Sequence, residues 1–233
     1  MNHEVSIQQG YYADTALAYE DMHDAEEHKF NLSFLLGCVD HFGWKTLLDV
    51  GAGTGRSLNR MAKKMPDLGL IGIEPVDELR EQGYRAGVAR EMLVAGDGTA
   101  LQFGDGEFDV VCSFGVLHHI KHPELAVAEM LRVAKKAVFI SDSNNFGQGS
   151  FGKRTFKQAA HALGLWGTVD LINTRGRGYS ISEGDGLFYS YSVFNNYKQI
   201  KSRCESVHLV NPLKADVNLF RTATHVGLLG VKK

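Results

Sequence analysis

The sequence is poor in proline and cysteine, and its cysteines lie far apart. Only four of its 233 residues are proline, and the three cysteines, Cys38, Cys112 and Cys204, form no CxxC pair. The odd count and wide spacing indicate neither a disulfide framework nor a cysteine zinc site, so we interpret each cysteine as a small buried core residue. No apolar run approaches the ~20 residues that cross a bilayer, so we expect no membrane span.

No charge of one sign dominates the chain. Lys and Arg number 25, Asp and Glu 27, and the formal net charge is -2. The strong basic field typical of nucleic-acid binders is therefore missing, and we expect no nucleic-acid partner. The first residues, MNHEVSIQQGYY, lack the basic and then apolar run of a signal peptide. We expect a cytoplasmic protein.

Glycine, by contrast, is plentiful, with 26 residues, and it punctuates an alternation of short apolar runs with helical patterns. The pattern predicts helices over residues 56–65, 76–84 and 123–134. The predicted strands cover residues 46–50, 69–74, 92–95, 108–114 and 137–141. Such an alternation predicts an α/β domain with a mostly parallel sheet covered on both faces.

The rest of the chain flanks this core without forming a second domain. Residues 1–45 contain a predicted helix over 24–42, and we treat them as N-terminal cap helices before the core at 46–141. Residues 142–191 interrupt the alternation with one predicted helix, 151–163, and a Gly-, Ser- and Tyr-rich stretch. In residues 192–233 we expect a final helix capped by Ser192, then two closing strands, 206–210 and 224–231.

The segment LLDVGAGTGR, residues 47–56, is the sharpest motif. A buried strand leads into glycines that let a backbone approach a ligand closely, at the sheet edge where open α/β folds bind ligands. A dinucleotide fingerprint requires a third glycine where Arg56 stands, and a P-loop requires Gly-Lys-Ser/Thr. The turn therefore favours a nucleoside without a pyrophosphate. Asp49 precedes the turn, and its carboxylate is costly to bury unless it meets backbone N–H groups or a cation.

Two further acids follow the next strands. Glu74 lies 25 residues after Asp49, at a distance typical of an acid that binds ribose hydroxyls. Asp97, in AGDGTAL, can accept a hydrogen bond from an adenine amino group, with the backbone N–H of Gly98 or Thr99 facing a ring nitrogen. The segment FDVVCSFGVLHHI, residues 108–120, closes the site from the fourth strand.

These motifs, in this order, resemble the small-molecule branch of class I S-adenosylmethionine-dependent methyltransferases, the type found in quinone and natural-product biosynthesis. The resemblance covers residues 47–141 and implies a doubly wound, seven-stranded Rossmann-like sheet, with 142–191 as a lid-like insertion over the methyl acceptor. One departure is that RVAKKAVFISD stands where members often have a Pro-Gly-Gly turn before the fifth strand. The insertion lies outside the resemblance.

The resemblance also implies S-adenosylmethionine as cofactor, with the glycine turn along its methionine moiety, Glu74 on ribose, Asp97 on adenine and Phe114 beside the sulfonium. Tyr12, with Tyr11 and Tyr19, either closes over this cation or packs the first helix. The expected cofactor-binding residues are Tyr12, Asp49, Gly51, Ala52, Gly53, Glu74, Pro75, Asp97, Gly98, Thr99 and Phe114.

For catalysis we expect His118 or His119 to act as a base, with Asp142, just past the fifth strand, as partner. Since consecutive side chains usually point apart, at least one histidine is expected to be structural. Adjacent histidines rarely share one ion and no HExxH spacing is present, so no metal is expected. Tyr179, Phe188, Tyr189 and Tyr191 line an acceptor pocket or pack the core, and Arg175 and Arg177 meet an anionic acceptor or are solvated.

The predicted function is methyl transfer from S-adenosylmethionine to a small molecule, with a hydroxyl oxygen of a sugar or secondary metabolite as the favoured acceptor. Methyl transfer to nitrogen or carbon is an alternative. A nicotinamide-dependent oxidoreductase and a catalytically silent nucleoside-binding protein are further alternatives. Assembly as a homodimer is left open.

Overall fold

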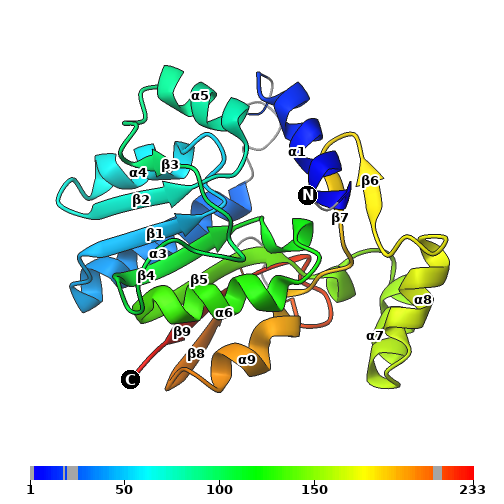
Figure 1. Ribbon diagram of the computed structural model, residues 1–233. Coiled ribbons are helices and arrows are strands. Elements are labelled where there is room, and N and C mark those ends of the chain that lie inside the picture. The colour runs from blue at the N-terminus through cyan, green and yellow to red at the C-terminus, as the bar shows by residue number, and fades with distance from the viewer. Residues whose placement is uncertain (1–2, 18, 20–25, 212–216) are drawn as a thin grey trace.

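The computed structural model describes residues 3–17, 19, 26–211 and 217–233. Its centre is a seven-stranded sheet in the order β3-β2-β1-β4-β5-β9-β8 (Figure 1). Strands β1 to β5 are parallel, and β9 is antiparallel to both of its neighbours. The strands are β1 Thr46–Val50, β2 Gly69–Ile73, β3 Leu93–Val94, β4 Phe108–Phe114, β5 Ala134–Ser143, β8 Ser206–Val210 and β9 His225–Val231. The predicted doubly wound α/β fold is confirmed.

Helices cover both faces of this sheet, as the alternation predicts. They are α3 Glu26–Phe42, α4 Arg56–Lys64, α5 Asp77–Arg85, α6 Pro123–Val133 and α9 Tyr197–Lys201, with α1 His3–Thr15 lying beyond the sheet edge. Pro123 occupies the first turn of α6, where its missing N–H costs nothing. Gly43, with φ of 66°, ends α3. None of the described helices combines the length and the hydropathy needed to cross a bilayer.

Consecutive residues of β1 serve opposite faces of the sheet, because side chains alternate along a strand. Leu47 packs with Leu35 of α3 and Leu58 of α4, whereas Leu48 packs with Met130 of α6. All five are fully buried. Two of the cysteines, Cys112 and Cys204, are core residues as predicted, and Cys38 is half-buried.

The insertion contains more structure than the single helix expected there. The predicted helix is α7, Phe151–Ala162, but a second helix, α8, Trp166–Asn173, follows it. A hairpin of β6, Ser180–Ser182, and β7, Gly186–Phe188, comes next. The expectation of one helix is wrong because α8 is short and starts among Gly164 and Gly167, which weaken a helical pattern. Figure 1 shows α7 and α8 standing beside the sheet domain and the hairpin next to α1.

The expected final helix is also broken up. A 3₁₀ turn, Val193–Asn196, precedes the short α9, and the predicted cap is confirmed because the Ser192 hydroxyl accepts from the Phe194 N–H at 3.3 Å. Strand β5 runs two residues further than predicted because it pairs with β9 as far as Ser143. Asp142 therefore lies within β5 and not just past it. The predicted start of α3, at residues 24–25, lies outside the described residues.

Candidate active site

The glycine-rich turn after β1 is held against the end of β2. The backbone N–H groups of Gly51 and Ala52 both donate to the carbonyl oxygen of Ile73 at 2.9 Å. Gly51 has a φ of 76°, and a Cβ there would lie 2.5 Å from a methyl carbon of Val116. Because both the left-handed φ and the lack of space disfavour a side chain, the motif's first glycine is required by the fold.

Glu74 follows β2 and its carboxylate is tied to the glycine turn. Oε2 accepts from the Gly53 N–H at 3.0 Å, and Oε1 accepts from the Val76 N–H at 2.9 Å. Burial raises the pKa of Glu74 to about 7, although both N–H bonds favour the charged form. A carboxylate has about four acceptor positions, so two remain for ligand hydroxyls.

Asp49 has a different partner from the one expected. Its side chain is 2% exposed, and the hydrogen bond it accepts comes from the Cys112 thiol at 3.6 Å, not from backbone N–H groups. Burial raises the pKa of Asp49 to about 7 because this weak donor offsets little of the cost of desolvation. Neither of the two partners named for this carboxylate, a backbone N–H group or a cation, contacts it among the described residues.

The turn after β3 is closed by hydrogen bonds to the carboxylate of Asp97, which lies within it. Oδ1 of Asp97 accepts from both the backbone N–H and the hydroxyl of Thr99 at 2.8 Å. The Thr99 N–H is thus engaged, which leaves the Gly98 N–H as the candidate for an adenine ring nitrogen. The remaining oxygen of Asp97 is available for the adenine amino group.

A cavity of about 330 Å³ opens over these three strand ends. From the predicted cofactor-binding set it is lined by Tyr12, Gly51, Glu74, Pro75, Asp97, Gly98, Thr99 and Phe114. Asp49 and Ala52 line a small adjoining pocket beside Gly51. Gly53 reaches neither space and instead donates to Glu74. The strand order alone therefore gathers nearly all of the predicted set.

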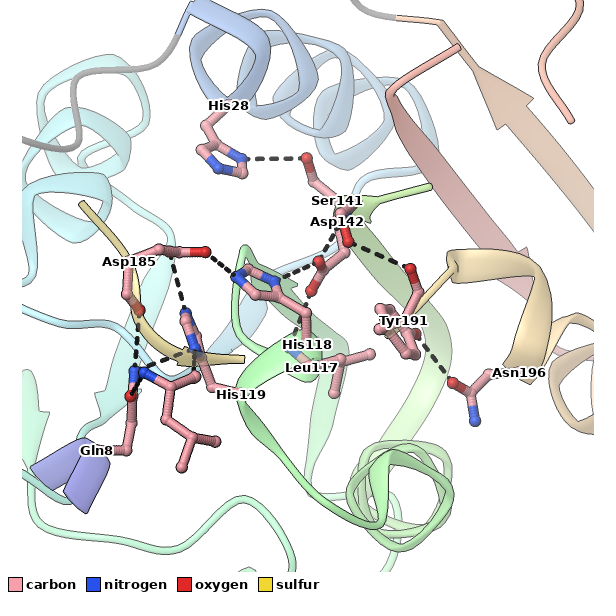
Figure 2. A network of polar contacts seen from close by, with 12 residues as sticks. Gln8, His28, Leu117, His118, His119, Ser141, Asp142, Asp185, Tyr191 and Asn196 are labelled. Carbon is pink, nitrogen blue, oxygen red and sulfur yellow. Dashed lines mark hydrogen bonds and ion pairs between the residues drawn. The ribbon is translucent and has the colours of Figure 1, made fainter. Parts of the chain in front are cut away.

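His118 and Asp142 form a buried pair where β4 and β5 end. His118 lies in a 3₁₀ turn, Leu117–His119, and its Nδ1 is 2.6 Å from Oδ1 of Asp142 (Figure 2). Asp142 is fully buried, and its Oδ2 accepts from the Leu117 N–H at 2.8 Å. Burial alone would lower the pKa of His118, but Asp142 and then Asp185 raise it to about 10. His118 is therefore an imidazolium at neutral pH.

His119 has the opposite character. Its Nδ1 lies 2.7 Å from the carbonyl oxygen of Leu187 and 3.0 Å from Nε2 of Gln8. The carbonyl is the shorter contact and can only accept, so the tautomer that satisfies it has the proton on Nδ1 and the lone pair on Nε2. The Tyr12 hydroxyl lies 3.0 Å from Nε2. Burial and the neighbouring His118 lower the pKa of His119. The two rings lie 3.9 Å apart between centroids, so the expectation that consecutive side chains point apart is wrong here.

Asp185 completes this cluster, and the sequence prediction missed it. It lies between β6 and β7, with Oδ2 at 3.3 Å from Nε2 of His118 and Oδ1 at 3.5 Å from Nε2 of His119. The Asp-Gly pair at residues 185–186, between two β-prone runs, is a hairpin signal that could have placed it in a turn. Nothing local indicates that this turn reaches the histidines, because the contact spans more than 60 residues.

These three side chains also offer the donor set of a metal site, with one ligand atom from each within 4.8 Å of the others. Imidazole and carboxylate together suit several divalent ions. The imidazolium of His118 nevertheless satisfies Asp142 and Asp185 without an ion. The absence of a metal stays a prediction.

A second cavity, of about 620 Å³, lies between the sheet edge and the insertion. It shares Tyr12, Phe114 and His119 with the first cavity, so the two spaces meet at these residues. The four insertion aromatics, Tyr179, Phe188, Tyr189 and Tyr191, line it. Arg175 and Arg177 do not line it and are exposed, which agrees with the interpretation of solvated charges.

Comparisons with known proteins agree with this geometry. The family model described as a methyltransferase domain matches residues 48–140. An uncharacterized methyltransferase of Mycolicibacterium gilvum is 30% identical over 64% of this chain and 61% of its own length. The demethylmenaquinone methyltransferase of Roseiflexus castenholzii is 35% identical over 38% of this chain and 37% of its own. The chain thus spans about three fifths of the first relative and little more than a third of the second.

Among solved structures, the magnesium protoporphyrin IX methyltransferase of Synechocystis, with S-adenosylhomocysteine bound, has a similar fold. It is 11% identical with a TM-score of 0.62, and the match covers 99% of this chain and 100% of that one. The family match identifies residues 48–140 as a methyltransferase domain, and the glycine turn, the strand order and the solved structure agree with the class I fold. The resemblance and S-adenosylmethionine as its cofactor are confirmed.

Proposed function

We propose that the whole chain transfers the methyl group of S-adenosylmethionine to a hydroxyl oxygen of a small polar molecule, such as a sugar or secondary metabolite. The observation that carries this proposal is the junction of the two cavities at Phe114 and His119. One cavity offers acids and backbone donors to a nucleoside, and the other offers hydroxyls, amides and aromatic rings to an acceptor. A methyl group passing between them crosses beside the histidine cluster.

In this proposal Glu74 accepts from the ribose hydroxyls, Asp97 accepts from the adenine amino group and Gly98 donates to an adenine ring nitrogen. The turn Gly51–Gly53 lies along the methionine moiety, near Asp49, while Tyr12, Pro75, Thr99 and Phe114 enclose the ligand. The bound cofactor supplies an electrophilic methyl carbon on sulfur. Holding donor and acceptor in line can lower the barrier by about 7–11 kcal/mol.

His119 is the proposed base. S-adenosylmethionine would supply the methyl group and leave as a neutral thioether, and the lone pair on Nε2 of His119 would take the proton that the acceptor hydroxyl loses, in place of its contact with the Tyr12 hydroxyl. His118 and Asp142 position the 3₁₀ turn that carries His119. A base at this position contributes typically ~10²–10⁴-fold. Of the three predicted catalytic residues, His119 is thus the proposed base, and His118 and Asp142 are positioning residues.

The acceptor atom is inferred from that lone pair, since a hydroxyl needs a proton acceptor more than an amine does. The relative from Roseiflexus castenholzii is a demethylmenaquinone methyltransferase by name, which supports a small-molecule acceptor and leaves nitrogen and carbon as alternatives. We place the protein in the cytoplasm, acting on a small molecule and not on nucleic acid, as a monomer or homodimer. Light scattering distinguishes these two assembly states.

The test combines calorimetry and turnover. S-adenosylmethionine and S-adenosylhomocysteine should bind with measurable heat, and a panel of hydroxyl, amine and carbon acceptors should yield one methylated class by mass spectrometry. His119→Ala should lower kcat about 10²-fold or more with O-acceptors while the Kd for S-adenosylhomocysteine changes little. His161→Ala, a histidine that packs on Phe146 outside both cavities, is the matched control. Cofactor binding without turnover on any acceptor would favour a nucleoside-binding protein instead.

A further inference from the structure

The outward sides of α7 and α8 expose apolar residues. Of the twelve large hydrophobic side chains that are exposed among the described residues, seven fall within residues 151–181. Phe151 is 78% exposed, Leu163 73% and Ile172 71%. Single exposed apolar residues are ordinary, but a concentration of this kind marks a surface that meets a partner.

The inward sides of the same helices are polar. Lys157, Asp170 and Thr174 line the 620 Å³ cavity. Ile172 lies two residues from Asp170 and therefore on the far side of α8, about 200° around the helix. The usual amphipathic arrangement is weakened, because polar groups face the cavity beside Trp166 while large apolar groups also face outward. Packing within the chain does not account for the outer apolar residues.

Residues 151–178, which include α7 and α8, have a net charge opposite in sign to that of the rest of the chain. Residues 151–178 contain five Lys and Arg and one Asp, a net charge of +4, whereas the chain as a whole has a net charge of -2. The other residues therefore carry a net charge of -6. Lys153, on α7, and Arg175, directly after α8, are both exposed. Two copies meeting through this surface would bring like charges together.

We propose that this docking face, formed by Phe151, Phe156, Leu163 and Ile172 with Arg175 directly after α8, binds an anionic lipid surface. Phe, Leu and Ile side chains enter the boundary between headgroups and acyl chains, while Lys and Arg meet the anionic headgroups. The acceptor cavity lies directly beneath the docking face, so bound protein holds that cavity close to the lipid. The inference stands independently of the proposed function.

The test is sedimentation of the full chain with vesicles of phosphatidylcholine alone and of phosphatidylcholine with phosphatidylglycerol. The chain should pellet with the mixed vesicles and not with phosphatidylcholine alone, and added salt should weaken the binding. Phe151→Ser and Ile172→Ser should each weaken binding about tenfold, and Arg175→Glu about fivefold or more. Phe30→Ser, at an exposed phenylalanine of α3, should bind like the wild type and is the matched control.

Three outcomes would overturn the proposal. The first is no pelleting with the anionic vesicles. The second is an equal loss of binding in Phe30→Ser and Phe151→Ser, which would remove the role of the docking face. The third is a dimer, seen by light scattering without vesicles, that Phe151→Ser dissociates, because the face would then belong to a second copy. Methyl transfer to a soluble acceptor is measured separately, so failure here leaves the proposed function untouched.

Discussion

Nδ1 of His118 lies 2.6 Å from Oδ1 of Asp142, and this buried pair links the turn after β4 to the neighbouring strand β5. Asp142 accepts in addition from the backbone N–H groups of Leu117 and Ser143. The opposite nitrogen of His118 faces Asp185 on the insertion (Figure 2). The His118 side chain thus connects β5, the 3₁₀ turn after β4 and the insertion.

The pair predicts a defined pH dependence of stability. The pKa of His118 is raised from 6.5 to about 10 by Asp142 and Asp185, so its contribution is fully present below pH 6.5 and is lost as pH rises through 10. The pKa of Asp142 is lowered from 3.8 to about 2, chiefly by His118 against the effect of burial, so its contribution is lost as pH falls below 3.8. Denaturant unfolding across this range should show the maximum between about pH 4 and 6.5.

The variant Asp142→Asn tests how much the His118–Asp142 pair contributes to the free energy of unfolding. Near pH 6.5 it should lower the free energy of unfolding by about 3–5 kcal/mol, because it leaves a buried imidazolium with half of its partners. The loss should shrink as pH rises toward 10. Asp105→Asn, at a side chain that is 82% exposed, is the surface control and should change stability by no more than about 0.5 kcal/mol. A loss that is constant with pH would contradict the assignment of charge to His118.

Glu74 predicts that cofactor affinity depends on pH. Burial raises the pKa of its carboxyl to about 7, and ribose hydroxyls donate to the ionised form, so binding should strengthen as pH rises through 7. The association constant for S-adenosylhomocysteine should rise about tenfold from pH 6 to pH 8 by calorimetry. Glu74→Gln should bind more weakly and abolish the slope, whereas Asp49→Asn should keep it. The same slope in Glu74→Gln would assign it to another group.

The parts of the fold predicted correctly from the sequence are those in which local pattern and tertiary packing agree. Leu47 and Leu48 belong to a strand buried on both faces, and the glycine turn that follows can adopt few conformations. The length of β5 depends instead on its pairing with β9, about 90 residues away, which no local pattern shows. Helix α8 was missed for a related reason, since it buries none of its residues and so carries no core-facing stripe.

In the candidate site, too, some residues could be predicted from local sequence patterns and others could not. Glu74 and Asp97 follow strand ends, and a parallel sheet brings its strand ends to one edge, so their convergence can be predicted from the order of motifs. Asp185 comes from an insertion whose path is set by contacts such as Gln8 of α1 to the Leu187 N–H. A contact spanning 179 residues leaves no trace in local spacing. The partner of Asp49 was mispredicted because Cys112 lies on a neighbouring strand, in register with it.

A third prediction concerns metal. Because the imidazolium of His118 already pairs with Asp142 and Asp185, chelation with EDTA should change neither cofactor binding nor turnover, and titration with Zn²⁺ or Mn²⁺ should release no site-specific heat. A stoichiometric signal that Asp185→Asn abolishes would contradict this and would turn His118, His119 and Asp185 into a cation site. The control for nonspecific binding is Asp170→Asn, which changes a half-buried acid that lines the same 620 Å³ cavity as His118, His119 and Asp185.

The last prediction separates the two reasons for glycine at position 51. Gly51→Ala should destabilise the protein by about 1 kcal/mol for its left-handed φ and by a further ~1–3 kcal/mol for the contact with Val116. Val116→Ala in the same chain removes the methyl carbons that the new Cβ meets, so the double variant should recover the second part and not the first. Gly152→Ala, where a Cβ meets nothing within 4 Å, should not destabilise the fold. If Gly51→Ala and the double variant lose equal stability in denaturant unfolding, steric overlap with Val116 contributes nothing, and backbone conformation alone requires glycine at this position.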